Sequence, residues 1–458
     1  MKRLLLSIFV FSSIANAQDS TGAATATTAT PTAEIQAPAT SSVTTQALTE
    51  DEDDEEHEAA VSTSIAKASD EKTYPKFEFK SYGYMVFGQR ETFKTVQNLT
   101  PITRREMDLA EIAFEGEYIL SESSKIEFEI EIEHGGVGTV IEFDPFEEFG
   151  EFEQEIEKGG EVVLPELYYK KTWKKTDTAL RVGKFPLFIA LGSVQTKPHM
   201  YASILASDLE ARMIPLNWTE MGVQVEQKFS DFTARLGIVS GLNSEFFRTY
   251  NWIGGGYQRH FETNNADDLA TLASLEWGSV AKGKGFALSY YAGNTTGNRY
   301  KVDKLKEDAE VTLWTLMGGY KIGGFGFSGE MIQGTLENSN LVSAANATLG
   351  GLAKPKSFAP LGHKARLESL QVYYDFASIR LTPFLKWEHV NTFDEVEGNI
   401  NKNPRYEVTR NSGGLMWFFD TGAFLKAQYA TEVTELDGLP ETYQANIAFG
   451  FDIDSFNK

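Results

Sequence analysis

Residues Ile126–Glu133 read Ile-Glu-Phe-Glu-Ile-Glu-Ile-Glu, a strict alternation of large apolar and acidic side chains. Successive side chains of a β-strand point to opposite faces of a sheet, so this stretch predicts a strand with one apolar and one charged face. The preceding segment, 103–119, repeats the pattern, with Ile112, Phe114 and Tyr118 on one face and glutamates on the other. In a membrane barrel the apolar face meets lipid and the polar face lines a watery lumen.

Similar segments, rich in Tyr, Phe, Trp, Val and Thr, recur from residue 73 to the end of the chain. Sixteen strands are predicted, and an even number is typical of bacterial outer-membrane barrels. Their approximate bounds are 76–90, 103–119, 124–134, 162–174, 178–186, 218–229, 231–241, 268–278, 283–294, 309–322, 324–334, 364–376, 378–390, 405–419, 422–434 and 440–456.

The connections between these segments alternate between short and long. Tight polar or glycine turns such as 120–123, 323–324 and 420–422 follow every second strand. Short periplasmic turns and long external loops give this alternation in a transmembrane barrel, whereas a soluble sandwich or propeller does not require it. The sequence therefore predicts an all-β fold, a 16-stranded antiparallel transmembrane β-barrel over residues 73–458. The long connections are expected at about 91–102, 135–161, 187–217, 242–267, 295–308, 335–363 and 391–404, with a short last one at 435–439.

Aromatic residues beside the predicted short turns support the barrel, because outer-membrane barrels carry aromatic girdles at the membrane interfaces. The closing segment 440–456 alternates in the same way and resembles the recognition signal used by the barrel assembly machinery. The eight aromatics beside the turns are Trp173, Phe229, Phe232, Trp277, Tyr320, Phe376, Phe418 and Phe419.

The N-terminus carries a secretory signal. Lys2-Arg3, the apolar run Leu4–Phe11 and the small residues Ala15–Ala17 fit a signal peptide over residues 1–17, and the apolar run is far too short for a membrane-spanning helix. Residues 18–72 are rich in Thr, Ala and Ser and then in acids, a composition that predicts a disordered linker.

Composition excludes several classes of function. The chain has no Cys, which removes disulfide frameworks, thiolate chemistry and Cys-based metal sites. Its 42 Lys+Arg against 65 Asp+Glu give a net charge of −23, the opposite of the basic surface that a nucleic-acid partner requires. Much of this charge lies outside the predicted strands, because residues 18–72 carry −10 and the connection 135–161 carries −8.

The polar faces of sixteen strands would line an aqueous channel. Seven glutamates on two adjacent strands form a predicted acidic wall, and six bases on later strands face it in part. We expect a transverse field that orients dipolar solutes and tunes ion selectivity; the alternative is that these groups merely balance one another. The acidic wall comprises Glu111, Glu115, Glu117, Glu127, Glu129, Glu131 and Glu133, and the bases are Arg181, Arg235, Arg380, Lys386, Arg410 and Lys426.

The third long connection, 187–217, is predicted to fold into the lumen as a constriction. It contains the apolar stretch Leu187–Leu191 and further aliphatic residues that an external loop does not need. Packing against a neighbouring protomer is the alternative. The candidate constriction residues are Lys197, His199, Asp208, Glu210 and Arg212.

The sequence gives no sign of catalysis. It contains no Ser-centred nucleophile elbow, no phosphate-cradling loop and no His-Glu-x-x-His motif, and its six His are scattered. We therefore expect no enzyme, no catalytic residue, no metal site and no cofactor.

Four short motifs resemble the phosphate-selective porin O and P family: Arg104-Arg105, the segment Ile126–Gly136, LRVGKFPLF at Leu180–Phe188 and GVQVEQKF at Gly222–Phe229. The resemblance is clearest over Tyr82–Phe232. It implies a sixteen-stranded, usually trimeric outer-membrane porin whose third loop folds into the pore. The phosphate-specific members carry a ladder of arginines and a lysine cluster in the lumen, whereas the second and third strands here present glutamates. The resemblance therefore does not extend to phosphate selectivity.

Together these observations predict an outer-membrane porin of a Gram-negative bacterium, a water-filled channel for passive diffusion of ions and small hydrophilic solutes. Its expected partners are outer-membrane lipid and lipopolysaccharide, the barrel assembly machinery and two further copies in a homotrimer. Two alternatives stay open. One is a substrate-specific channel for phosphate or a siderophore, and the other is a non-conducting adhesin or scaffold barrel.

Overall fold

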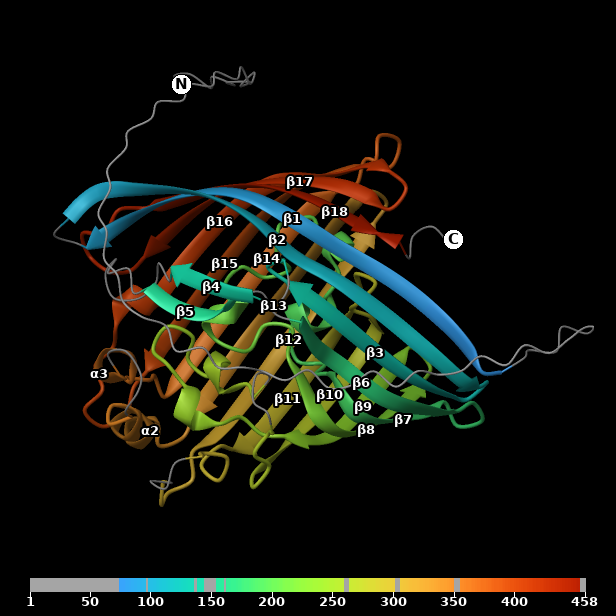
Figure 1. Ribbon diagram of the computed structural model, residues 1–458, viewed down its shortest axis with the longest axis horizontal. Helices are drawn as coiled ribbons and strands as arrows, with labels where there is room; N and C mark the ends of the chain where they lie inside the picture. Colours follow the sequence, from blue (N-terminus) through green and yellow to red (C-terminus); the bar gives the residue numbers. More distant parts are fainter. Residues whose placement is uncertain are drawn as a thin grey trace, which may run out of the picture. The chain divides into compact units, whose positions relative to one another are not determined.

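A closed antiparallel β-barrel dominates the computed structural model, which describes residues 74–95, 98–135, 138–143, 154–159, 162–258, 263–300, 305–349 and 355–453. Sixteen of the described strands form the barrel in sequence order, and the first strand, β1, pairs with the last, β18, with Tyr82 opposite Asp452 (Figure 1). The predicted fold class is confirmed. The predicted signal peptide and linker, residues 1–72, lie outside the described residues.

The barrel strands lie close to their predicted positions. Their bounds are β1 Lys76–Thr95, β2 Asn98–Ser121, β3 Ser124–Glu133, β6 Val162–Trp173, β7 Thr178–Pro186, β8 Thr219–Phe229, β9 Phe232–Ser240, β10 Leu269–Ser279, β11 Lys284–Asn294, β12 Glu310–Ile322, β13 Phe325–Leu336, β14 Lys364–Tyr374, β15 Leu381–Glu395, β16 Glu407–Asp420, β17 Ala423–Thr434 and β18 Thr442–Asp452.

Two of the predicted long connections are wrong in detail. The expected loop at 91–102 is mostly strand, because β1 and β2 keep pairing up to Thr95 opposite Asn98. The expected loop at 135–161 contains a separate two-stranded sheet of β4 Gly138–Phe143 and β5 Gln154–Gly159. In both places the strand-like alternation continues beyond the turn signals that marked the prediction.

Side chains alternate between the two faces of the barrel wall as the period of two requires. On β10, Leu275 and Trp277 are exposed, whereas Ala270 and Leu272 are buried. Because this alternation repeats around the barrel, large apolar side chains cover the outer surface, and the inward-pointing side chains are shielded from solvent. Such an outer surface fits a lipid environment rather than water.

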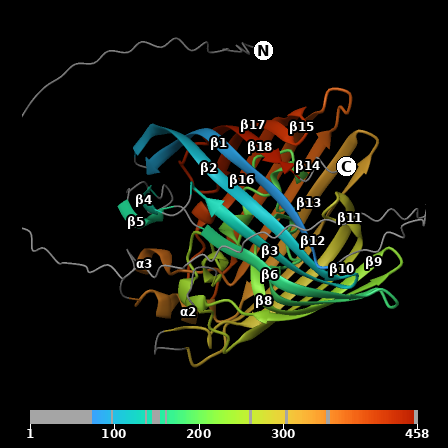
Figure 2. The ribbon, with the colours of Figure 1, turned by 45° about the vertical axis from the view of Figure 1, so that its right-hand side comes forward.

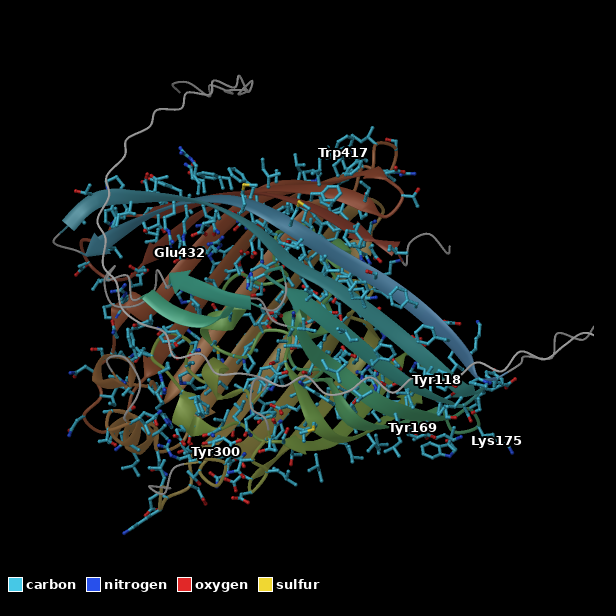
Figure 3. All side chains as sticks on the ribbon, viewed as in Figure 1. Tyr118, Tyr169, Lys175, Tyr300, Trp417 and Glu432 are labelled. Atoms are coloured by element: carbon cyan, nitrogen blue, oxygen red, sulfur yellow. The ribbon has the colours of Figure 1, made fainter. Side chains whose placement is uncertain are left out.

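Seven of the eight aromatics predicted beside the short turns are more than a third exposed on this surface. Phe418 is the exception, because it packs inward against Phe424, with ring centroids 5.5 Å apart. Figure 3 shows Tyr118 and Tyr169 close to the turn that holds Lys175, in keeping with an aromatic girdle at that end.

Short helices lie in the long connections. Two of them, α2 Ser339–Asn346 and α3 Pro355–Phe358, lie between β13 and β14, and both views place them at the long-connection end of the barrel (Figures 1 and 2). The others are α1 Leu191–Val194 and the 3₁₀ helices η2 Pro198–Met200, η3 Glu210–Arg212, η4 Ser244–Phe246, η5 Gly254–Gly256 and η6 Pro404–Tyr406. Within the described ranges, none of the helices has both the length and the apolar character that crossing a membrane demands.

Candidate functional site

The third long connection, residues 187–218 and hereafter L3, crosses the interior of the barrel. It leaves β7 and returns to β8, and seven strands separate β8 from β16 in either direction around the barrel. L3 nevertheless contacts β15, β16 and β17, on the wall opposite its own ends. A loop that bonds to both walls spans the lumen, so the predicted inward folding is what the structure has.

Asp208 anchors L3 to the far wall through two cations. Its carboxylate lies 3.2 Å from Lys386 Nζ on β15 and 3.3 Å from an Arg410 guanidinium nitrogen on β16. Burial raises the pKa of Asp208, but the two cations outweigh burial and hold that pKa below its usual range. Asp208 is therefore ionised at neutral pH, and Lys386 and Arg410 are committed to holding the loop.

Glu388 on β15 receives the backbone beside this anchor. Its Oε1 accepts hydrogen bonds from the Ser207 hydroxyl at 3.0 Å and from the Asp208 N–H at 2.8 Å. Lys386 Nζ lies 3.3 Å from the same oxygen. With Arg410 also 3.4 Å from Glu432 on β17, each cation of this buried network meets two carboxylates, an arrangement that low dielectric makes costly to break.

β17 adds a third set of contacts. Lys426 Nζ donates to the carbonyl oxygen of Ser203 at 2.7 Å and lies 4.0 Å from the centre of the Tyr201 ring. The Ile204 N–H donates to the Gln428 side chain at 2.8 Å. Lys426, which the sequence assigns to the lumen, therefore bonds to the backbone of L3 and is fully buried.

Two acidic side chains, one of L3 and one of β13, bind the backbone of L3 at residues 191 and 192. Glu210 on η3 accepts the Gly192 N–H at 3.0 Å, and Glu330 on β13 accepts the adjacent Leu191 N–H at 2.8 Å. Burial raises the pKa of Glu210 well above its usual range, and the neighbouring Glu330 carboxyl raises it further. Glu210 and Glu330 thus each hold one of two consecutive backbone N–H groups at the start of α1.

The three remaining constriction candidates also contact the barrel wall. Lys197 Nζ lies 2.6 Å from Glu115 on β2, and Arg212 lies 2.7 Å from Glu432 on β17, a residue labelled in Figure 3. His199 pairs with Asp452 on β18. All five candidates are therefore brought to the lumen, where they hold L3 in place.

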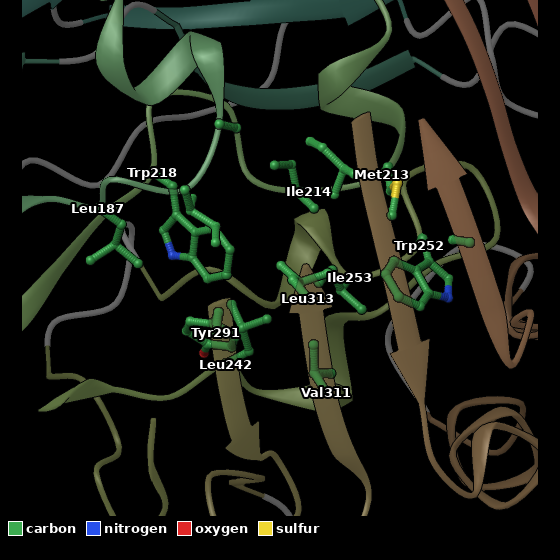
Figure 4. Packing of buried hydrophobic residues seen from close by; sticks show 14 of the residues in the cluster. Leu187, Met213, Ile214, Trp218, Leu242, Trp252, Ile253, Tyr291, Val311 and Leu313 are labelled. Carbon is green, nitrogen blue, oxygen red and sulfur yellow. The ribbon is translucent and has the colours of Figure 1, made fainter. Parts of the chain in front are cut away.

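An apolar core lies inside the barrel, where L3 and later long connections pack against strands from β6 to β16 (Figure 4). Trp218 and Trp252 are buried in it, and Trp218 packs against Tyr291 with ring centroids 4.8 Å apart. Trp218 Nε1 also donates to Glu220 at 2.9 Å. This core packs L3 and the next long connection against the inner face of the barrel wall.

The acidic wall lies on the interior side of β2 and β3. The register sets Glu111 opposite Glu133, Glu115 opposite Glu129, and Glu117 opposite Glu127. Glu129 is also opposite Glu166 on β6. Like charges directly across a ladder repel, and nearby lysines offset part of this repulsion, because Lys125 lies 2.9 Å from both Glu117 and Glu127.

Partners inside the barrel hold these carboxylates in position. Tyr82 donates to Glu129 at 2.6 Å and Tyr168 donates to Glu127 at 2.7 Å. Gly183 on β7 permits the close strand approach beside Tyr168, because a Cβ there would lie 2.4 Å from the Leu167 carbonyl oxygen. Its φ of 132° also lies in the region that favours glycine.

A cavity of about 220 Å³ lies between the acidic wall and L3. Six glutamates and two lysines line it, so the formal charge around it is strongly negative. The charged lining residues are Glu78, Lys80, Glu115, Glu117, Glu127, Glu129, Glu166 and Lys197.

The bases not yet described occupy two different settings. Arg235 on β9 is buried, bonds to Glu226 at 3.1 Å and to Glu276 at 2.7 Å, and lies 4.0 Å from the Phe188 ring of L3. Arg181 on β7 lies 4.0 Å from Glu226. Acids outside the predicted set thus contact both bases, an arrangement close to the alternative in which the lumen charges balance one another.

Arg380 needs a further correction, since it is not on a strand. It lies in the turn before β15 with a φ of 53°. There it lines a second cavity of about 830 Å³ at the short-turn end, together with Lys282, Lys321 and the L3 residue Tyr201. The turn between β14 and β15 extends through Arg380, so β15 begins at Leu381 and not at residue 378 as predicted.

The sequence reading missed the acids that complete this network, namely Glu166, Glu226, Glu276, Glu330, Glu388, Glu432 and Asp452. Alternation alone could have assigned them to the inner face, because each lies on a predicted strand. Alternation could not show which residue each acid contacts, because each contact depends on where L3 or a neighbouring strand lies in the folded barrel.

The chain matches no known family profile and no characterised protein sequence. Among solved structures, the outer-membrane channel DcaP of Acinetobacter baumannii aligns over 83% of this chain and 98% of its own, with a TM-score of 0.50 and 8% identity. The anion-selective porin of Comamonas acidovorans aligns over 82% and 100%, with a TM-score of 0.48 and 10% identity. OprB of Pseudomonas putida aligns over 82% and 94%, with a TM-score of 0.48 and 9% identity.

At such identities the likeness shows the fold alone. The chain has a porin-like barrel of sixteen strands, the architecture of outer-membrane channels.

Proposed function

We propose that this protein is an outer-membrane porin that lets ions and small hydrophilic solutes diffuse passively, with a preference for cations. The observation that carries the proposal is the distribution of lumen charge. The interior bases Arg235, Lys386 and Arg410 are bonded to acids, while the cavity beside Glu115 and Glu129 is lined by six glutamates against two lysines. A passage lined in this way concentrates cations and repels anions.

The proposal includes the membrane and the partners expected from the sequence. The apolar outer surface with its aromatic girdle supports residence in the outer membrane of a Gram-negative bacterium, in contact with lipid and lipopolysaccharide. Insertion by the barrel assembly machinery and assembly as a homotrimer complete it. We further propose that the protein is not an enzyme, and we keep kinship with the phosphate-selective porin O and P family as a proposal based on the four sequence motifs.

Planar-bilayer recording of the purified protein tests this function. Discrete conductance steps are expected, and in a salt gradient the reversal potential should have the sign of a cation-preferring pore. Glu115→Gln and Glu127→Gln should each reduce that potential, because each removes a carboxylate beside the cavity.

Glu122→Gln is the matched control, since Glu122 pairs with Lys174 at 3.0 Å in an exposed turn outside the lumen. An absence of channel steps would favour the scaffold or adhesin alternative. Strong anion preference would favour a substrate-specific channel that uses Lys282, Lys321 and Arg380 around the larger cavity.

A further inference from the structure

A cluster of metal-ligating side chains lies apart from L3, at the long-connection end of the barrel. Glu337 directly follows β13, His363 directly precedes β14, and Glu397 lies just beyond β15. One imidazole nitrogen and one oxygen from each carboxylate all lie within 4.8 Å of one another. The three strands are neighbours in the barrel, so the sheet brings together residues that are far apart in the sequence.

The distances around His363 suit a coordination shell. Its Nδ1 lies 2.9 Å from Glu397 Oε1 and 3.0 Å from the carbonyl oxygen of Leu336. Around an ion with metal–ligand distances of about 2.1 Å, ligand atoms at right angles lie about 3 Å apart. One nitrogen that faces two oxygens at this separation therefore matches neighbouring positions around a cation.

The ligands are held in place before any ion arrives. Ser339, at the start of α2, donates its N–H at 2.9 Å and its hydroxyl at 3.2 Å to Glu397 Oε2, while Oε1 lies beside His363. The His363 N–H donates to the Glu395 carbonyl at 2.8 Å, and the His363 carbonyl accepts the Leu336 N–H at 2.7 Å. Outer contacts of this kind orient metal ligands and strengthen binding.

The neighbouring cations each pair directly with a carboxylate outside the cluster, and Lys364 also interacts electrostatically with Glu337. Lys364 pairs with Glu395 at 2.9 Å, and Arg366 lies 3.5 Å from Asp394. With a neutral imidazole, Glu337 and Glu397 carry two formal negative charges, which a divalent cation would balance.

We propose that Glu337, His363, Glu397 and the Leu336 carbonyl oxygen bind a divalent first-row transition-metal ion. An imidazole ligand favours such an ion over Mg²⁺ or Ca²⁺, which prefer oxygen alone. The ion would join the segments that follow β13 and β15 to the start of β14, and so fasten the external rim of the barrel. The scattered histidines gave no sign of this site in the sequence, because only the strand register brings His363 between the two acids.

Zn²⁺ titration of the purified full-length protein by calorimetry tests the site. Binding is expected in the wild-type protein, and His363→Ala and Glu397→Gln should each weaken it by about 100-fold or more. Ser339→Ala should weaken it about 10-fold, because it removes only an orienting hydroxyl. Ca²⁺ in place of Zn²⁺ should bind far more weakly in the wild-type protein.

His389→Ala is the matched control. His389 lies near one carboxylate, Glu407, at 3.7 Å and contacts the Thr409 hydroxyl at 3.0 Å. Its loss should leave the Zn²⁺ titration unchanged, and any background binding by the acidic segment around His57 is common to all variants.

Glu337→Gln guards against a folding artefact, because Glu337 is exposed. It should weaken Zn²⁺ binding while the protein keeps the gel mobility of the folded barrel. The proposal is overturned if Zn²⁺ binds equally well to the wild-type, His363→Ala and Glu397→Gln proteins, or if the wild-type protein shows no site. In either case the His363–Glu397 contact is an ion pair that only joins the loops.

Discussion

Replacing Asp208 by Asn should loosen L3 from the far wall of the barrel. The substitution keeps the size of the side chain and removes the charge that meets Lys386 at 3.2 Å and Arg410 at 3.3 Å. The backbone contact from residue 208 to Glu388 stays, so the change isolates the charged anchor.

The free-energy cost of Asp208→Asn depends on which carboxylates still contact Lys386 and Arg410. Lys386 retains Glu388 at 3.3 Å and Arg410 retains Glu432 at 3.4 Å, so neither is left buried without a counter-charge. A hydrogen bond to a charged group contributes roughly 1.5–3 kcal/mol, and the loss of two such contacts with partial compensation costs about 3 kcal/mol. At about 1.4 kcal/mol per factor of ten, the detached form of L3 should become about 100-fold more populated.

Trypsin cleavage after Arg212 measures that population, because the attached loop holds Arg212 against Glu432 at 2.7 Å and cleavage tracks the open form. The cleavage rate should rise about 100-fold, with noisier single-channel currents. Asp394→Asn is the control, since its contact with Arg366 at 3.5 Å lies outside L3 and is partly exposed. If Asp208→Asn is cleaved no faster than Asp394→Asn, the assignment of Asp208 as an anchor is wrong.

The other predictions concern pH and the apolar core. Because the pKa of Asp208 is lowered in the folded protein, the stabilisation of attached L3 by Asp208 is fully present above the usual carboxyl pKa and is lost as pH falls through the lowered pKa. Wild-type L3 should therefore resist cleavage by a protease active in mild acid and be cleaved only below about pH 3.8. The raised pKa of Glu210 has the opposite sign. The stabilisation of attached L3 by Glu210 is fully present below the usual glutamate pKa and is lost as pH rises through the raised pKa. Glu210→Gln should therefore flatten the rise in loop cleavage at alkaline pH, and an unchanged pH profile would contradict this. Trp218→Ala removes a fully buried ring and should destabilise the packed interior by about 3–5 kcal/mol, measured by urea unfolding, with a loss under 1 kcal/mol as the contrary result.

Local pattern was enough to predict the wall of this protein. Each strand alternates lipid-facing and interior side chains with a period of two, and that pattern depends only on backbone geometry and on the two media it separates. Leu275 and Trp277 outside, with Leu272 inside, obey it without reference to any distant residue. The alternation of short and long connections likewise fixed which end of the barrel holds the loops.

The same reasoning failed where a residue's role depends on its partner. Alternation assigns Lys386, Arg410 and Lys426 to the interior, as a partly basic wall or as charges that balance one another, because the sequence does not say that Asp208 and the Ser203 carbonyl meet them. Arg380 was assigned to a strand because a turn residue with a left-handed φ leaves no clear mark in the alternation.

The sequence by itself determined a sixteen-strand barrel, its apolar exterior and the glutamates of β2 and β3. Only the tertiary structure decided which residues of the opposite wall L3 bonds to, an arrangement that takes up Lys386 and Arg410 and leaves the acidic wall beside a cavity. The physical reason is range. Alternation acts between residues one or two positions apart, whereas Asp208 with Arg410, and Glu337 with His363 and Glu397, meet only after barrel closure fixes which distant strands are neighbours.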